Sequence, residues 1–421
     1  MYQLSLFFRN YPQPFSPTCT KLEALNCVPG PVVKSLQILP LFPSNTSHNS
    51  RQKIINDLKE WSFTSKTWKW LDTVTYDQSN VTDAKLNILK NLNKMSSDGD
   101  VPKQTIMLAF LSGPKENAVD NKFRKEIKNL AASQNMASQC VQGITILKFK
   151  ALGIISAVNA KAGGQNQICP GLAEKGTFFI AYDVSRYGGT SIDVGFGVFG
   201  FNGTVFQQAM GNRQKGEVLD ESFSENSLRE FLKQAKMIEH IQHVVVFRDG
   251  RFVQNMSKEV ETLERVTNAY GMKATFVSVT KSAPGLFRMM RFEGEPTHSK
   301  HEPKLPIQKN LKFKVDMPHS GVFCSLKADT AILNTIGPGQ IKDNYIGIPT
   351  GRALPKPLTI TKIKGTASLN EIVEWVYHLS RLKSYSNRPT RLPAPQHLAD
   401  RAAKDFLDGI IYPHVRGLHA A

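Results

Sequence analysis

The stretch GTFFIAYDVSRYGGT, residues 176–190, decides the fold of this chain. Its apolar and aromatic run from Phe178 to Tyr182 stops at Asp183, and glycines follow at positions 188 and 189. We interpret the run as a buried strand that ends in a carboxylate before the chain turns back. The sequence therefore predicts a charged group where a core strand meets solvent.

A second stretch, HVVVFRDG at residues 243–250, repeats this pattern, because its apolar run ends in Asp249 and Gly250. If the two strands are neighbours, Asp183 and Asp249 lie side by side at one edge of a sheet. Like charges held that close repel each other unless a cation lies between them. The pair predicts a cation site, although Asp-Gly is also a common turn dipeptide.

The segments around these strands predict the order of a ribonuclease-H-like fold. The hairpin signal Asn202-Gly203 makes strand 177–183 the start of an antiparallel meander, which a helix and the second aspartate strand follow. A polar loop at 211–217 and a basic excursion at 281–314 interrupt this half. We expect its other strands at 191–201, 204–208, 243–248 and 274–280, and helices at 225–237, 257–270, 368–383 and from 396 onward.

The first half alternates between apolar runs and amphipathic segments, which is typical of an α/β layer with parallel strands. We expect strands at 33–41, 105–111 and 140–147, and helices at 50–61, 81–95, 118–132 and 148–161. Residues 1–32 show no clear period, so we expect an irregular lead-in or linker remnant there. The sequence divides into this lead-in, a first domain at 33–165 and a second domain at 166–421.

The composition points to a nucleic-acid partner. The 421 residues include 53 Lys and Arg against 35 Asp and Glu, a net charge of +18. Such an excess favours a polyanion, and nucleic acid before a membrane. The five cysteines are scattered without a C-x-x-C pair, which argues against a disulfide framework and a zinc site. With no apolar run long enough for a membrane span and no leader, we expect a cytoplasmic protein.

Four carboxylates form the candidate catalytic set: Asp183, Glu217, Asp249 and Asp400. Phosphodiester hydrolysis by two Mg²⁺ or Mn²⁺ ions needs hard oxygen ligands that hold the ions about 4 Å apart. We expect the three aspartates to be metal ligands, with the glutamate contributed by a loop bounded by glycines. His397 is an alternative to Asp400, which we prefer because a hard cation favours carboxylate over imidazole.

Polar residues of the first half form a candidate phosphate site. Arg124 and Lys128 lie one turn apart on a predicted helix, Gln139 lies by a strand, and Lys161 ends the next helix. Convergence of three cations and an amide at one end of an α/β layer suits a terminal phosphate. The alternative is that these residues are simply the solvated faces of helices.

Two groups of segments carry a family resemblance. In the second half they are AYDVSR (181–186), VVVFRDGRF (244–252), GIPTGRALPKPLTI (347–360) and RPTRLPAPQHLADRAA (388–403), and in the first half NAKAGG (159–164). The second-half segments resemble the PIWI domain of Argonaute proteins, and the first half resembles the MID domain. The resemblance covers roughly residues 33–415 and implies a Rossmann-like MID domain followed by a ribonuclease-H-like PIWI domain, as in prokaryotic-type Argonautes.

The resemblance implies roles for the same carboxylates. The family's metal-binding tetrad of Asp, Glu, Asp and then Asp or His falls on Asp183, Glu217, Asp249 and Asp400. Glu221 lies in the same segment as Glu217 and is the alternative for the second position.

The resemblance also implies contacts with a guide strand. The guide's 5′ end would be held by Arg124, Lys128, Gln139 and Lys161, with Arg124 where Tyr is commoner in the family. Arginine there loses base stacking but adds charge, which leaves open whether the guide end is phosphorylated. The nucleic-acid backbone would be contacted by Arg352, Arg388 and Arg391.

Three functions remain open on the sequence alone. The first is a guide-directed endonuclease that cleaves a complementary target strand. The second is a non-cleaving guide-binding module that acts through a partner effector, as short relatives usually do. The length leaves no room for N-terminal and PAZ domains, which favours the second reading or a PAZ-like partner, whereas four carboxylates favour the first. The third is an unguided ribonuclease-H-fold nuclease. Whether guide and target are DNA or RNA has no linear signature.

Overall fold

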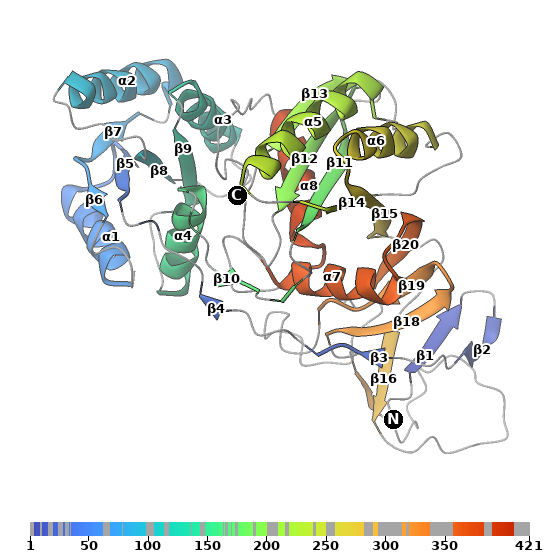
Figure 1. Ribbon diagram of the computed structural model, residues 1–421. Coiled ribbons are helices and arrows are strands. Elements are labelled where there is room, and N and C mark those ends of the chain that lie inside the picture. Colours follow the sequence, from blue (N-terminus) through green and yellow to red (C-terminus); the bar gives the residue numbers. More distant parts are fainter. Residues whose placement is uncertain are drawn as a thin grey trace.

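The chain consists of two α/β bodies, seen in a computed structural model as a smaller blue-to-teal body and a larger green-to-red one (Figure 1). The structure describes residues 4–8, 11–15, 20–23, 28–29, 33, 35–61, 68–77, 79–97, 105–112, 118–134, 136–143, 148–162, 164, 167–169, 171–172, 176–187, 191–199, 209–214, 219–238, 241–249, 257–281, 289–293, 314–316, 320–336, 357–382 and 390–407. Each body is built on its own sheet.

The smaller body is a parallel sheet with helices on both faces. Its strands are β5 (Gln37–Pro43), β6 (Lys69–Trp70), β7 (Val74–Tyr76), β8 (Thr105–Leu111) and β9 (Ala137–Gln142), in the order β6-β5-β8-β9 with β7 also paired to β5. All residues of β5 and β8 are buried, as expected for strands covered on both sides. The covering helices are α1 (His48–Trp61) and α4 (Lys148–Lys161) on one face and α2 (Val81–Ser97) and α3 (Ala118–Ser133) on the other.

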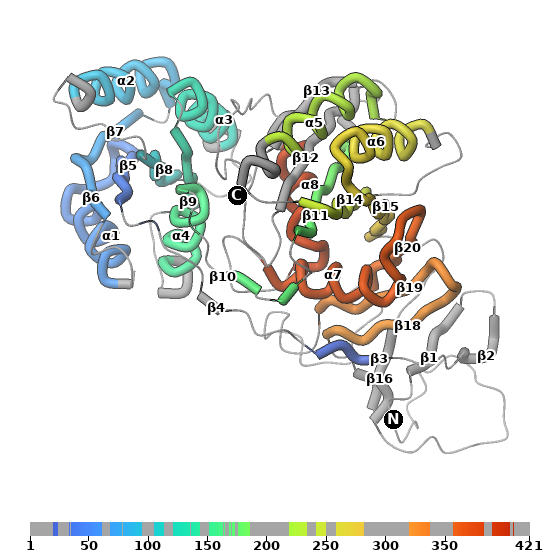
Figure 2. The backbone as a smooth tube through the Cα atoms, in the orientation of Figure 1, coloured from blue at the N-terminus to red at the C-terminus, as the bar shows by residue number. Residues whose placement is uncertain are grey.

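The larger body has a mixed sheet, with nine strands among the described residues. The three central strands β11 (Thr177–Tyr187), β14 (His243–Asp249) and β15 (Lys273–Thr280) are parallel. Antiparallel strands extend the sheet on both sides, from β13 at one end to β3 at the other. Figure 2 shows the blue strand β3 beside the orange strand β18 at this second end. They are β12 (Ser191–Phe199) and β13 (Ala209–Gln214), then β20 (Leu358–Gly365), β19 (Thr330–Leu333), β18 (Val322–Lys327) and β3 (Thr20–Lys21). The expected ribonuclease-H-like order and the mixed α/β class are confirmed.

Strand alternation sorts the residues of the central strands between two helical layers. Phe178, Ile180 and Tyr182 pack toward α5 (Glu221–Ile238) and α6 (Ser257–Ala269). Phe179 and Ala181 pack toward α7 (Leu369–Arg381) and α8 (Ala394–Leu407). Because successive strand residues point to opposite faces, Asp183, Asp249 and Lys281 share the face that α8 covers.

The N-terminal residues take part in the sheets. The lead-in at 1–32 was expected to be irregular, but its described residues form β1 (Leu4–Phe8), β2 (Tyr11–Phe15), β3 and β4 (Val28–Pro29). β2 pairs with the neighbouring β1, whereas β1, β3 and β4 also pair with strands remote in sequence, which are β16 (Met289–Glu293), β18 and β10 (Gln167–Ile168). A local pattern does not reveal such remote pairing, and the same holds for β16, within the expected basic excursion, and for β17 (Lys314–Asp316), which begins at the last residue of that excursion.

Several strand boundaries differ from the sequence prediction, among them that of β5, which lies at Gln37–Pro43 and not at 33–41. β11 continues four residues beyond Asp183 to Tyr187, because β12 pairs with it along this whole stretch. The third meander strand lies at Ala209–Gln214, where we expected the start of a polar loop, and β9 ends at Gln142. The predicted turn at 202–203 lies outside the described residues.

Candidate active site

Register brings the first two aspartates together. β11 and β14 pair in parallel up to Tyr182 opposite Arg248, so Asp183 and Asp249 stand at the next level of neighbouring strands. Asp183 therefore does not end its strand, as the sequence suggested, but it does follow the last residue of the parallel ladder. The two carboxylates lie side by side on the face covered by α8.

Asp400 reaches this pair from α8. The buried Gln396 donates its amide N–H to the carbonyl of Val279 at 2.9 Å, and the Arg391 guanidinium donates to the carbonyl of Lys281. These bonds fix the start of α8 against the end of β15. One turn after Gln396, Asp400 then lies over the aspartate pair.

The three aspartates form a compact acidic cluster. One carboxylate oxygen from each of Asp183, Asp249 and Asp400 lies within 4.8 Å of the others. Asp183 is buried, whereas the side chains of Asp249 and Asp400 are each 17% exposed. Clustered carboxylate oxygens with partial access to water are a ligand set that could hold a hard divalent cation.

Two lysines supply positive charge at the cluster. The ammonium of Lys281 lies 2.7 Å from Asp249 Oδ2 and 2.8 Å from Asp400 Oδ1. Lys404 lies 2.6 Å from the other Asp400 oxygen, Oδ2. The site is thus able to hold a cation between two of its carboxylates.

The pKa values of Asp183 and Asp400 are shifted in opposite directions. Burial, and then the charges of Asp249 and Asp400, raise the pKa of Asp183 to about 6. Burial also opposes ionisation of Asp400, but hydrogen bonds from Lys281 and Lys404 outweigh it and lower the pKa of Asp400. Burial works against the charge of Lys281 as well, yet hydrogen bonds to Asp249 and Asp400 raise the pKa of Lys281 to about 12.

The raised pKa of Asp183 predicts a pH dependence of stability in the metal-free protein. Between pH 4 and 6 the folded state binds more protons at Asp183 than the unfolded state, so this group's contribution to stability falls as pH rises. Asp183→Asn should therefore exceed the wild type by about 2 kcal/mol in unfolding free energy at pH 7, and the gap should close near pH 4. Urea unfolding in chelator measures both.

The test compares the variant with the wild type at each pH, because His378 also makes the stability of either protein depend on pH. Burial lowers the pKa of His378 to about 4, so the contribution of this residue to the stability of the folded protein falls as pH drops below 6.5. The histidine is present in both proteins and cancels in their difference. An Asp183→Asn advantage that is equal at pH 4 and pH 7 would contradict the assignment.

The candidate phosphate-site residues lie on β9, the edge strand of the smaller sheet, and on the two helices that pack against it. Lys161 is buried at the end of α4, and its ammonium donates to the carbonyl of Ser138 at 2.5 Å, beside Gln139. Arg124 and Lys128 are half-buried on α3, which packs on the same strand from the opposite face. In Figure 1, α3, β9 and α4 lie on the side nearer to the larger body.

The remaining predicted residues divide by what the structure describes. Glu217, Arg352 and Arg388 lie outside the described residues. Arg391, just before α8, is half-buried and donates to the main-chain carbonyls of Lys281 and Pro357. Between the alternatives for the last ligand, Asp400 and not His397 belongs to the cluster.

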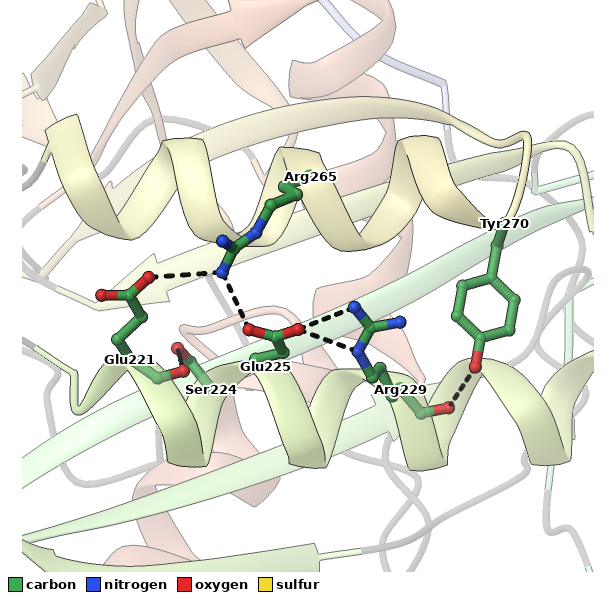
Figure 3. Close-up of polar contacts among 6 residues, drawn as sticks. All are labelled: Glu221, Ser224, Glu225, Arg229, Arg265 and Tyr270. Atoms are coloured by element: carbon green, nitrogen blue, oxygen red, sulfur yellow. Dashed lines mark hydrogen bonds and ion pairs between the residues drawn. The ribbon is translucent and has the colours of Figure 1, made fainter.

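Glu221, the alternative for Glu217, serves another contact. It is 63% exposed at the start of α5 and pairs with Arg265 of α6 at 3.2 Å. Figure 3 shows that Arg265 also binds Glu225, which in turn binds Arg229. This row of ion pairs joins α5 to α6 on the face opposite the aspartates, which leaves the glutamate position to Glu217 as a prediction.

Sequence reasoning missed a buried ion pair behind the site. Arg248 Nε lies 3.2 Å from Glu259 Oε1, and both side chains are almost wholly inaccessible to solvent. The guanidinium also lies 5.0 Å from the centre of the Tyr182 ring. Tyr182 and Arg248 immediately precede Asp183 and Asp249, so their side chains support these residues from the opposite face of the sheet. The signal available in the sequence was the alternation of strand residues, which places Tyr182 and Arg248 on the face of the sheet that α6 covers.

A ribonuclease-H-like sheet with carboxylates on two parallel strands and a late helix defines the class of protein to which this chain belongs. Comparison with known families identifies this class more specifically, because residues 106–410 match the Piwi domain. The chain belongs to the Piwi domain family. Within the described residues, no helix is both long and apolar enough to cross a membrane.

Similar proteins agree with this family. The argonaute protein of Thermus thermophilus is 28% identical over 222 residues, which are 52% of this chain and 26% of that protein. The Clostridium butyricum Argonaute, solved with a guide DNA and a 19-mer target DNA, superposes with a TM-score of 0.74 at 18% identity over 96% of this chain and 55% of that one. The A. aeolicus Argonaute gives 0.60 at 17% identity over 94% and 51%. The chain thus spans about half the length of these solved structures.

Proposed function

We propose that this chain is the guide-binding and target-cleaving portion of an Argonaute-type endonuclease. Residues 33–165 would hold the guide's 5′ end as a MID domain, and residues 166–421 would cleave the paired target as a PIWI domain. The acidic cluster of Asp183, Asp249 and Asp400 in a Piwi-family sheet is the observation that carries the proposal.

The chain's own residues supply the framework for hydrolysis. The three aspartates would hold the divalent ions, and Glu217 would complete the set from its loop. Bound Mg²⁺ or Mn²⁺ would activate water and stabilise the leaving oxygen of the phosphodiester. The half-open side of the cluster, at Asp249 and Asp400, is where a target backbone would approach.

Binding to nucleic acid is supported by charge and by the smaller body. The net charge of +18 favours contact with the phosphates of a paired guide and target. Arg124, Lys128, Gln139 and Lys161 would hold the guide end around β9, whereas Arg352, Arg388 and Arg391 would contact the backbone. If the protein contacts only the nucleic-acid backbone, the target sequence is selected by base pairing with the guide.

The direct test is cleavage of a labelled target. The protein is loaded with a short 5′-phosphorylated DNA guide, because the Clostridium butyricum relative was solved with guide and target DNA. We expect Mn²⁺-dependent cutting of the complementary DNA at one position, and none with an unrelated guide or in chelator. Parallel reactions with RNA guides and targets define the nucleic acid used. Cutting that ignores the guide would replace the proposal with an unguided nuclease.

Lys128→Ala should weaken guide binding. Loss of one charge-assisted hydrogen bond to the guide's terminal phosphate should raise the dissociation constant about tenfold. Fluorescence anisotropy with a labelled 5′-phosphorylated guide measures it. Lys122→Ala is the matched control, since Lys122 is an exposed lysine of the same helix. Equal effects of both variants on the dissociation constant would show that Lys128 contributes only general positive charge and no specific contact with the phosphate.

One observation favours the second function, a non-cleaving guide-binding module. Lys281 already compensates two of the three carboxylates, so the cluster does not need a metal to be stable. This function predicts tight guide binding, a co-purifying partner protein, and no cutting of a paired target with either Mg²⁺ or Mn²⁺.

A further inference from the structure

Lys281 lies at the centre of the acidic cluster. Its ammonium makes two contacts of 2.7 and 2.8 Å, to Asp249 on a strand and to Asp400 on a helix. Its side chain is 35% exposed, so the ammonium lies at the boundary between the cluster and solvent. The contact joins two candidate metal ligands that are far apart in sequence.

The fold builds this position. Val277 and Val279 of β15 pack toward α7 and α8, and Lys281 follows with the same period of two. The carbonyl of Lys281 accepts a hydrogen bond from Arg391, at the start of α8. The main chain of Lys281 is therefore fixed between the end of β15, the neighbour of the strand that carries Asp249, and the start of the helix that carries Asp400.

Lys404 provides an internal comparison. It contacts Asp400 alone, from four residues further along the same helix, and its side chain is 63% exposed. An exposed i,i+4 pair of this kind contributes little. Lys281, in contrast, bridges two carboxylates and lies deeper.

A divalent ion and the Lys281 ammonium compete for the same oxygens. Mg²⁺ and related ions bind carboxylate oxygens at about 2.0–2.6 Å, inside the space that the ammonium fills when it contacts both aspartates. Two cations so close also repel each other in a partly buried site. We propose that Lys281 is a resident counter-ion that a divalent metal must displace, and that it thereby sets the metal concentration at which the centre fills.

This inference rests on the proposed metal-dependent function, and it has a definite direction. Without Lys281, the metal-free cluster loses its main charge compensation, whereas the metal-bound cluster does not. Lys281→Met, which keeps the length of the side chain but removes the charge, should therefore bind metal more tightly. The same variant should be less stable than the wild type when metal is absent.

The experiment is a calorimetric titration of MnCl₂ into the full chain without nucleic acid. We expect Lys281→Met to bind Mn²⁺ at least about tenfold more tightly than the wild type. Lys404→Met, which removes an equal charge from Asp400's outer oxygen, should change the affinity by less than about threefold. Thermal unfolding should show a lower Tm for Lys281→Met in chelator and a larger rise with Mn²⁺. Lys281→Gln replaces Lys281→Met if the latter does not fold.

The outcomes separate this inference from the proposed function. Unchanged or weaker Mn²⁺ binding by Lys281→Met, in a chain whose wild type cleaves a guided target, overturns the role of Lys281 and leaves the nuclease intact. Tighter binding by the variant, in a chain that never cleaves, supports the counter-ion and removes the nuclease. Equal tightening by Lys404→Met also overturns the inference, since the effect would then be general charge, as does no Mn²⁺ binding by wild type and variant alike.

Discussion

Replacing Asp249 by asparagine is expected to abolish target cleavage while guide and target binding stay within about threefold of wild type. Asp249 is linked to both of the other aspartates: it lies on the strand next to that of Asp183, and it shares the Lys281 ammonium with Asp400. Asparagine keeps the shape but loses a charged oxygen ligand. We expect the single-turnover rate at saturating Mn²⁺ to fall by about 10³-fold or more.

The measurement uses a preformed guide complex and excess protein, so that the rate reports the chemical step. Fluorescence anisotropy with an uncleavable target reports binding separately. Asp329→Asn is the matched control, since Asp329 is an exposed aspartate at the turn between β18 and β19 of the same sheet. A variant rate within about tenfold of wild type would show that Asp249 is not a metal ligand.

Local patterns predicted the aspartate pair well. The apolar runs before Asp183 and Asp249 have the length and bias of core strands, and the parallel register then places the two carboxylates side by side. Each long helix was also predicted near its observed position, and for most of them the signal was an amphipathic period, which does not depend on remote partners. These local signals were enough to predict the ribonuclease-H-like order, which the structure confirms.

Long-range contacts were not visible in the same way. A lysine after a strand normally belongs to a solvated turn, and only the arrival of Asp400, 119 residues later, gives Lys281 its bridging position. Likewise, residues 184–187 are too polar to predict a core strand, but pairing with β12 extends β11 through them. The sequence signal ends where a partner from elsewhere in the chain completes the structure.

Breaking the Arg248–Glu259 pair is expected to cost the larger body about 3–5 kcal/mol of unfolding free energy. Both side chains are buried, and burial is the main cause that raises the pKa of Glu259, while Arg248 opposes it. Glu259→Gln would leave the Arg248 guanidinium buried without its countercharge, and Arg248→Met would leave the carboxylate in the same state. Amide hydrogen exchange of the segment 243–249 in chelator measures the loss within this body.

The double variant Arg248→Met with Glu259→Gln makes the test specific. Because the cost of each single change arises from one uncompensated charge, removing both charges should recover much of the stability. Arg248 also donates to the carbonyl of Asp249 at 3.2 Å, so both variants that lack the arginine should bind Mn²⁺ more weakly, whereas Glu259→Gln keeps this bond. If the losses of the single variants simply add in the double variant, the pair is not an interacting unit, and the support of Asp249 must come from the strand alone.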